Sequence, residues 1–256
     1  MNNVIEIQGL RKIYASNGDL IHALEGVDLH VREGEFVSIV GPSGCGKSTL
    51  LKIVAGLYPP TRGRVSVNGK LVQGPHADIG IVFQNPVLMS WRTVLKNILL
   101  QAEVRGLDRD VYRKRAVELL DLVGIQGFEN RFPYQLSGGM QQRVAICRAL
   151  VHDPTLLLMD EPFGALDALT REQMNLELTR IWSKSGKTVL FITHSIPEAV
   201  FLSDRVIVFS ERPGRVLADL PIGFGRPRGL KTMEAPEFSR MVGRIREYMQ
   251  ASGGID

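Results

Sequence analysis

The strongest chemical signal in the sequence is residues 41–49, which read GPSGCGKST and match the spacing G-x-x-x-x-G-K-[ST]. Glycines accept positive φ angles, so successive backbone N–H groups can turn toward a phosphate chain without Cβ collisions. The apolar stretch FVSIV precedes this segment and STLLKIVAGL follows it, which predicts a strand, a turn and a helix. A helix start adds partial positive charge and unpaired donors. The alternative is a tight glycine turn with a chance lysine, which would not require this context.

The side chains of this segment suit a nucleotide with its metal ion. Lys47 supplies a full charge for the β- and γ-phosphates, and the Ser48 hydroxyl is an oxygen ligand of the kind that Mg²⁺ prefers. We therefore predict a phosphate site made of Gly41, Pro42, Ser43, Gly44, Cys45, Gly46, Lys47, Ser48 and Thr49.

A second apolar stretch, residues 155–159, is followed by two adjacent carboxylates, Asp160 and Glu161. Ligands of open parallel sheets bind beyond the carboxyl ends of the strands, where a phosphate loop also lies. Asp160 is then expected to hold Mg²⁺ with its water shell, and Glu161 to accept a proton from an attacking water. The alternative is a pair of solvated acids at a strand end.

Residues 136–154, LSGGMQQRVAICRALVHDP, predict another glycine-rich helix start, with Ser137 as its N-cap and Pro154 beyond its end. One triphosphate does not need two such helix starts from the same molecule. From the residues alone, this start is either a capped helix or a contact with the nucleotide of another molecule.

Composition describes an ordinary soluble globular protein of 256 residues, with 31 Lys and Arg against 27 Asp and Glu, and 44% hydrophobic residues. Two cysteines exclude a disulfide framework. No apolar stretch approaches the roughly 20 residues that cross a bilayer, and no export signal begins the chain, so we expect a cytoplasmic location. The slight basic excess is not clustered, so we interpret it as solvated surface and expect no nucleic-acid partner.

Hydrophobic patterning predicts an α/β core with a mainly parallel sheet, because several apolar runs are continuous and alternate with helical patterns. Residues 88–152 are mainly helical and are expected to form an inserted subdomain, while the earliest strands add a small antiparallel sheet. A final amphipathic segment, residues 236–250, is interpreted as a docked helix, with a partner-binding helix as the alternative. The expected strands are 4–8, 35–40, 64–67, 79–83, 155–159, 188–193 and 205–209, and the expected helices are 48–57, 110–123, 138–151, 168–185 and 196–201.

The stretches GPSGCGKST, LSGGMQQR and LLLMDEPFGALD, in this order, resemble the nucleotide-binding subunits of ABC transporters over residues 4–225. The resemblance implies a P-loop NTPase domain at 1–225, a helical tail at 226–256, and ATP with Mg²⁺. It also implies a homodimer, or a pair with a like cassette, that encloses two ATP molecules. Membrane-spanning permease subunits, and indirectly a solute-binding protein, would be partners at the cytoplasmic face of the inner membrane.

Further residue roles follow from that resemblance alone. Ser137, Gly138 and Gly139 would contact the γ-phosphate held by the other cassette. Met140 replaces the usual glutamine of the motif and cannot supply its amide hydrogen bonds. The remaining positions are Tyr14 for stacking on adenine, Gln84 for Mg²⁺ and water, His194 for bridging Glu161 and the γ-phosphate, and Asp167 for the loop that crosses the dimer interface.

A finer resemblance points to importers of nitrate, sulfonates, taurine and similar anions, through residues 83–98, 160–174 and 204–215. The alternative is a soluble ABC ATPase of repair or translation, which would usually carry a coiled-coil insertion or a second cassette.

Cys45 adds a hypothesis of its own, because a helix N-terminus lowers the pKa of a nearby thiol. Alkylation of a reactive Cys45 would block nucleotide binding, and ATP would protect it. The alternative is an inert loop filler. Cys147, in the middle of a predicted helix, is expected to be buried and unreactive.

Overall fold

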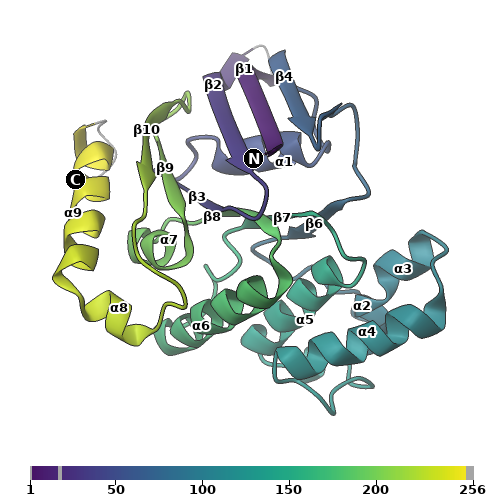
Figure 1. The fold of residues 1–256 in the computed structure, drawn as a ribbon. Helices are drawn as coiled ribbons and strands as arrows, with labels where there is room; N and C mark the ends of the chain where they lie inside the picture. The colour runs from purple at the N-terminus through teal and green to yellow at the C-terminus, as the bar shows by residue number, and fades with distance from the viewer. Residues whose placement is uncertain (1, 17–18, 252–256) are drawn as a thin grey trace. The chain divides into compact units, whose positions relative to one another are not determined.

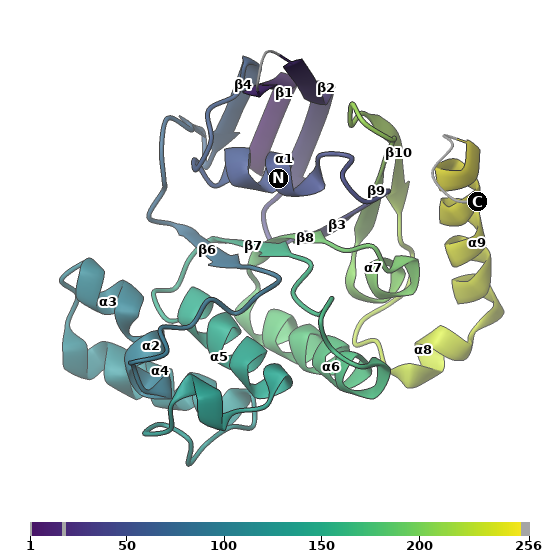
Figure 2. The same cartoon turned by 180° about the vertical axis from the view of Figure 1, so that it is seen from behind.

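The computed structural model describes residues 2–16 and 19–251 (Figures 1 and 2). The chain divides into two compact units. The first unit is Met1–His76 with Lys187–Asp256, and the second is Ala77–Gly186. Each unit carries part of the predicted chemistry, so each is described by itself.

An antiparallel sheet in the first unit is made of β1 (Asn3–Ser16), β2 (Asp19–Arg32), β4 (Arg62–Val67) and β5 (Lys70–Leu71), in the order β2-β1-β4-β5. The alternating burial of strand β2 explains why it forms: Val27, Leu29 and Val31 are buried and alternate with exposed Asp28 and His30. Helix α1 (Lys47–Val54) packs against β2 and β4 of this sheet, as Figure 1 shows.

The parallel strands of the first unit follow a continuous apolar pattern. Strand β3 (Phe36–Val40) is buried along its whole length and pairs in parallel with β8 (Thr188–Ile192) and β9 (Arg205–Phe209). Strand β10 (Val216–Pro221) pairs antiparallel to β9. Helix α7 (Ile196–Leu202) follows β8 and packs against β3 and β9.

The C-terminal segment packs on α7 through its apolar side. Helix α8 (Leu230–Glu234) leads into α9 (Pro236–Ala251), where Phe238, Ile245 and Met249 are buried. Buried Arg228 donates to the carbonyl oxygens of Phe201 and Ser203 at 2.9 and 2.8 Å, and so satisfies the end of α7. The tail is therefore held by apolar contacts and by a buried guanidinium.

The second unit contains the parallel pair β6 (Ile79–Val82) and β7 (Leu156–Asp160) and most of the helices. Helices α2 (Val94–Ile98) and α4 (Arg109–Leu122) pack with α5 (Gly138–Leu150). Helix α3 (Leu100–Val104) packs with α2 and α4, and α6 (Ala168–Ser185) follows β7. A short 3₁₀ turn, Pro133–Gln135, precedes α5. Across the described residues of both units, none of the helices combines the length and the apolar character that crossing a bilayer requires.

The predicted α/β class, with an antiparallel sheet and parallel strand pairing, is confirmed. Neither β2 nor β10 was predicted from the sequence, although the alternation at Val27, Leu29 and Val31 was a usable signal for β2. The first strand was predicted to end at residue 8, whereas β1 continues to Ser16 through Gly9, whose φ is +54°. The left-handed glycine and the register shifts of this strand pair interrupt the simple alternation.

One buried histidine generates a prediction about acid stability. His152 follows α5 and is 9% exposed, and burial together with the charges of Arg105 and Arg115 lowers its pKa to about 4. Since the unfolded chain protonates this imidazole more readily, its contribution to stability is complete above pH 6.5 and is lost as pH falls toward 4. We expect this loss to reach about 2 kcal/mol between pH 6.5 and 5.

Urea unfolding of the wild type and of His152→Gln at both pH values measures the effect. The variant should lose less stability on acidification, whereas His30→Gln, a change at an exposed position of β2, should behave as the wild type. The same acid loss in His152→Gln would contradict this assignment.

Candidate nucleotide site

The phosphate loop, residues 41–49 of the first unit, is shaped by glycine. Gly44 and Gly46 have φ angles of +74° and +111°, which residues with a Cβ rarely adopt, and Gly46 is the N-cap of α1. Lys47 is only 5% exposed, and its Nζ donates to the carbonyl oxygens of Gly41 and Pro42 at 2.7 and 2.8 Å. The lysine therefore ties its own loop together and lies within the loop that is predicted to hold phosphate.

Two of the loop glycines are also required by space. A Cβ on Gly46 would lie 2.6 Å from the carbonyl oxygen of Ala23 in β2, and one on Gly41 would lie 2.9 Å from Cβ of Phe209 in β9. The loop backbone is thus packed directly against two strands, and a side chain at either glycine would displace it.

Tyr14 lies within β1 and is half-buried, whereas the strand predicted from the sequence, residues 4–8, ended before it. Its hydroxyl donates to Thr49 Oγ1, the last residue of the phosphate loop, at 3.4 Å. Lys12 Nζ lies 5.0 Å from the centroid of its ring, and Tyr58 meets it edge-to-face at 6.3 Å. The structure therefore brings the predicted adenine-stacking ring into contact with the predicted phosphate loop.

His194 lies two residues beyond β8 and is exposed. The turn that presents it is fixed on both sides: Ser195 caps α7 by accepting from the N–H of Glu198, and the Ser195 N–H donates to Thr193 Oγ1 at 3.0 Å. The Thr193 hydroxyl also donates to the buried carboxylate of Glu198. The His194 imidazole therefore lies just beyond the carboxyl end of β8, on a turn that hydrogen bonds hold in place.

In the second unit, Asp160 ends β7 and Glu161 follows it with a φ angle of +44°. A non-glycine residue in this region is strained, and such strain concentrates at functional sites. Glu161 and Gln84 both lie close to Gly164, because a Cβ on this glycine would be 3.7 Å from Glu161 Oε2 and 3.2 Å from Gln84 Nε2. Two residues predicted to handle water and metal are therefore neighbours.

Gln142, which was not predicted from the sequence, supports the backbone next to Gln84. Gln142 is 2% exposed within α5, and its Nε2 donates at 3.2 Å to the carbonyl oxygen of Phe83, the residue before Gln84. Its position four residues before the buried Ile146 places it at the start of an apolar helix stripe. A polar residue at that position was the signal that could have found it.

The starts of α5 and α6 lie beside one another in the second unit. Ser137 caps α5 by accepting from the N–H of Met140 at 3.3 Å, and Asp167 caps α6 by accepting from the N–H of Thr170 at 3.0 Å. The hydrogen bonds from Thr170 lower the pKa of the Asp167 carboxyl. A Cβ on Gly139 would lie 3.0 Å from Thr170 Cγ2, so the predicted residues Ser137, Gly138, Gly139 and Asp167 form one cluster.

The expectation that the helix N-terminus lowers the pKa of Cys45 is wrong. Cys45 is 1% exposed, and burial raises the pKa of its thiol above the usual value. Lys47 opposes this shift, but desolvation is the larger effect. The local rule for helix N-termini fails here because the thiol points into the protein and not toward solvent.

Comparison with known proteins identifies the family. The family model described as ABC transporter matches residues 24–164. The chain belongs to the ABC transporter family. An uncharacterized ABC transporter ATP-binding protein of Methanocaldococcus jannaschii is 50% identical over 93% of this chain and 89% of its own. The taurine import ATP-binding protein TauB of Rhizobium johnstonii is 47% identical over 93% of both chains.

Solved ABC structures show the same fold. A dimeric bacterial ABC transporter cassette is 38% identical, with a TM-score of 0.76 over 86% of this chain and all of its own. A dimeric ATP-binding cassette in a post-hydrolysis state, bound to ADP and Pi, is 37% identical with a TM-score of 0.75 over the same shares. Membership of the ABC family makes this chain an ATPase that uses ATP with Mg²⁺.

The residues of this ABC ATPase fit those cofactors. The loop glycines leave the backbone free to approach phosphate, and Lys47 provides a buried charge among their carbonyls. The predicted Mg²⁺ ligands Ser48, Gln84 and Asp160 offer hydroxyl, amide and carboxylate oxygens, the hard donors that this ion selects.

Thiol labelling checks the corrected view of Cys45. Cys45 and Cys147 are the two cysteines of the chain; both are buried, and burial raises the pKa of each thiol. We expect the native ABC ATPase to react with neither maleimide nor dithionitrobenzoate over minutes, with or without ATP, and to show two thiols after denaturation. Rapid labelling of native Cys45, prevented by MgATP, would restore the original hypothesis.

Proposed function

We propose that this chain is the ATP-hydrolysing subunit of an importer for a small sulfonate-type anion, with taurine as the model substrate. The observation that carries the proposal is the 47% identity, over 93% of both chains, to a protein named as a taurine import ATP-binding protein. The substrate would be selected by membrane and solute-binding subunits, and this chain would act at the cytoplasmic face of the inner membrane.

The phosphate loop binds ATP in this proposal. Its N–H groups and Lys47 neutralise the β- and γ-phosphates, while the Tyr14 ring stacks on adenine. Ser48, Gln84 and Asp160 hold Mg²⁺, which supplies charge neutralisation between the phosphates. Glu161 takes a proton from the attacking water, and His194 orients that carboxylate toward the γ-phosphate.

A homodimer is the working unit of the proposal. The cluster of Ser137, Gly138 and Gly139 contacts the γ-phosphate bound by the other copy, and Asp167 lies in the loop that crosses between copies. Two related cassettes that were solved as dimers support the dimeric state. ATP then favours the closed dimer because only that state contacts the γ-phosphate from both chains. Hydrolysis removes the γ-phosphate contacts and with them the preference for the closed state.

Glu161→Gln separates binding from hydrolysis. Removing the general base should lower kcat by about 10²- to 10⁴-fold while ATP still binds. An ATP-bound dimer should then accumulate, which size-exclusion chromatography with MgATP detects. Glu118→Gln, at an exposed position of α4, is the matched control and should hydrolyse ATP like the wild type. Normal turnover by Glu161→Gln, or no dimer with ATP, would contradict the assigned roles.

A rigid apolar surface on the second unit supports a membrane-subunit partner. Val87 and Trp91 are 61% and 73% exposed, and Val87 holds a φ angle of +47°, which is strained for a β-branched residue. Arg148 donates to the Val87 carbonyl oxygen at 2.8 Å, and buried Asn97 exchanges two hydrogen bonds with the Met89 backbone. Exposed apolar side chains on a fixed backbone are typical of an interaction site.

We expect Trp91→Glu to abolish co-purification with a hydrophobic permease subunit from detergent-solubilised membranes, while ATPase activity of the isolated subunit is kept. Val111→Glu changes an equally apolar, 61% exposed residue on α4 and should leave co-purification intact. Recovery of the permease with Trp91→Glu would remove this surface from the proposal. Absence of any membrane partner for the wild type would favour the soluble ABC ATPase alternative.

A further inference from the structure

A glycine distant in sequence from the phosphate loop packs against its backbone. Gly214 lies in the turn between β9 and β10, and a Cβ at this position would be 2.3 Å from the carbonyl oxygen of Cys45. Real Cβ contacts essentially never fall below 3.0 Å. The φ of Gly214 lies outside the left-handed region, so the position requires glycine because of space and not because of backbone conformation.

The turn cannot easily retreat from the loop, because hydrogen bonds tie it to β2 and close it on itself. The Gly214 N–H donates to the carbonyl oxygen of Ala23 at 3.0 Å, and the Glu25 N–H donates to the carbonyl oxygen of Gly214 at 3.1 Å. Within the turn, Ser210 and Arg215 exchange two hydrogen bonds, N–H to carbonyl oxygen and N–H to Oγ, each 3.0 Å long. Displacement of Gly214 would break the hydrogen bonds that it makes with Ala23 and Glu25.

The same carbonyl of Ala23 also borders the loop, 2.6 Å from where a Cβ of Gly46 would lie. Three backbone segments therefore meet: β2 at Ala23, the turn at Gly214, and the phosphate loop at Cys45 and Gly46. Toward the loop tip, Glu211 and Arg212 of the turn line a groove of about 320 Å³ together with Pro42, Ser43 and Gly44. The turn and the loop thus also face one another across this groove.

We propose that Gly214 is a positioning residue for ATP binding: the absence of a side chain there sets the place of the Cys45 carbonyl and of the phosphate-binding N–H groups that follow it. The inference rests on the phosphate loop binding ATP as stated above. Gly214 itself touches no substrate and acts through the loop.

Gly214→Ala is the direct test, because its Cβ would force the Cys45 carbonyl to move by several tenths of an ångström. Because a misplacement of about 1 Å can cost on the order of 100-fold in the rate of a positioned reaction, we expect the displaced N–H groups to bind MgATP and MgADP about tenfold or more weakly. KM should rise accordingly and kcat should change less. Cys45 should become open to dithionitrobenzoate while Cys147 stays protected, as peptide mapping distinguishes.

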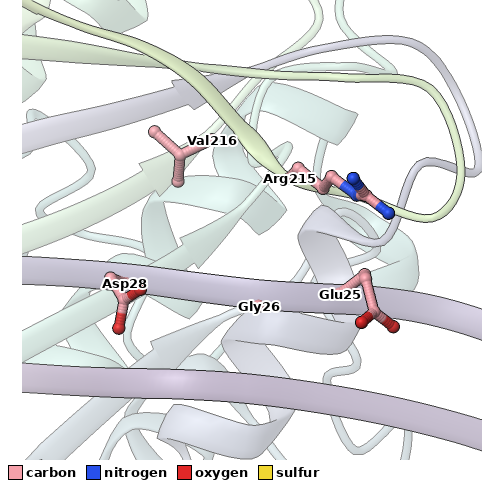
Figure 3. A pocket seen from close by; sticks show the side chains of 5 residues that line it. All are labelled: Glu25, Gly26, Asp28, Arg215 and Val216. Carbon is pink, nitrogen blue, oxygen red and sulfur yellow. The ribbon is translucent and has the colours of Figure 1, made fainter.

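Two control variants isolate the contact. Gly223→Ala adds the same methyl group where nothing lies within 4 Å and φ is outside the left-handed region. Arg215→Ala changes a neighbour in the same turn whose side chain borders a different groove, lined by Glu25, Gly26, Asp28 and Val216 (Figure 3). Both controls should bind ATP like the wild type and keep Cys45 protected.

Unchanged ATP affinity and a protected Cys45 in folded Gly214→Ala would overturn the proposal. Simultaneous labelling of both cysteines with a large fall in Tm would also count against it, since the effect would then be general unfolding. Should Gly214→Ala not fold, Ser210→Ala decides: loss of the Oγ acceptor of the Arg215 N–H should weaken ATP binding several-fold, and wild-type affinity would refute the role of the turn.

Measurements on the wild-type chain distinguish failure of the proposed function from failure of the positioning role of Gly214. Failure of the wild-type chain to bind ATP would refute the proposed function, whereas selective labelling of Cys45 in Gly214→Ala would still support the packing claim.

Discussion

Direct packing of backbone on backbone around the phosphate loop is the constraint on which the rest of the site depends. A loop that turns its N–H groups toward an anion cannot use them to hold itself in place, and its glycines raise the entropy cost of ordering it. Neighbouring segments supply part of the rigidity, because Ala23 borders Gly46 and Phe209 borders Gly41. Within the loop, the Lys47 side chain donates to two loop carbonyls. Burial of the Cys45 thiol follows from the same packing, and for this reason we expect the thiol to be unreactive.

In the second unit, hydrogen bonds and close contacts connect the exposed apolar surface to the acidic strand end. Arg148 of α5 holds the carbonyl of Val87, and Gln142 of the same helix holds that of Phe83, next to Gln84. Gln84 and Glu161 meet around Gly164. This continuity is a spatial route from the proposed partner surface to the predicted general base, and it would carry a signal only if these contacts had two arrangements. Strain at Val87 and Glu161 marks both ends of the route.

Much of the fold and of the candidate site was predictable, for reasons that lie in local pattern. The strand Arg205–Phe209 and the helix Ala168–Ser185 were predicted to the residue, since a continuous apolar run and a capped helical period are both local signals. Strand β2 was not predicted from the sequence, because left-handed glycines and register shifts interrupt its pairing with β1. The helix-terminus rule misled at Cys45 because it ignores what covers the thiol.

The sequence by itself determined which residues have phosphate and proton chemistry, and the order of the strands and helices around them. It also determined membership of the ABC transporter family, which Gly41 to Thr49, Ser137 and Asp160 imply. Those features are encoded by neighbours along the chain, where glycine φ angles, caps and hydrophobic period act. Only the tertiary structure decided that Gln142 supports Gln84 and that Gly214 abuts Cys45. Contacts between segments far apart in sequence have no local signature, because they depend on how strands and helices pack.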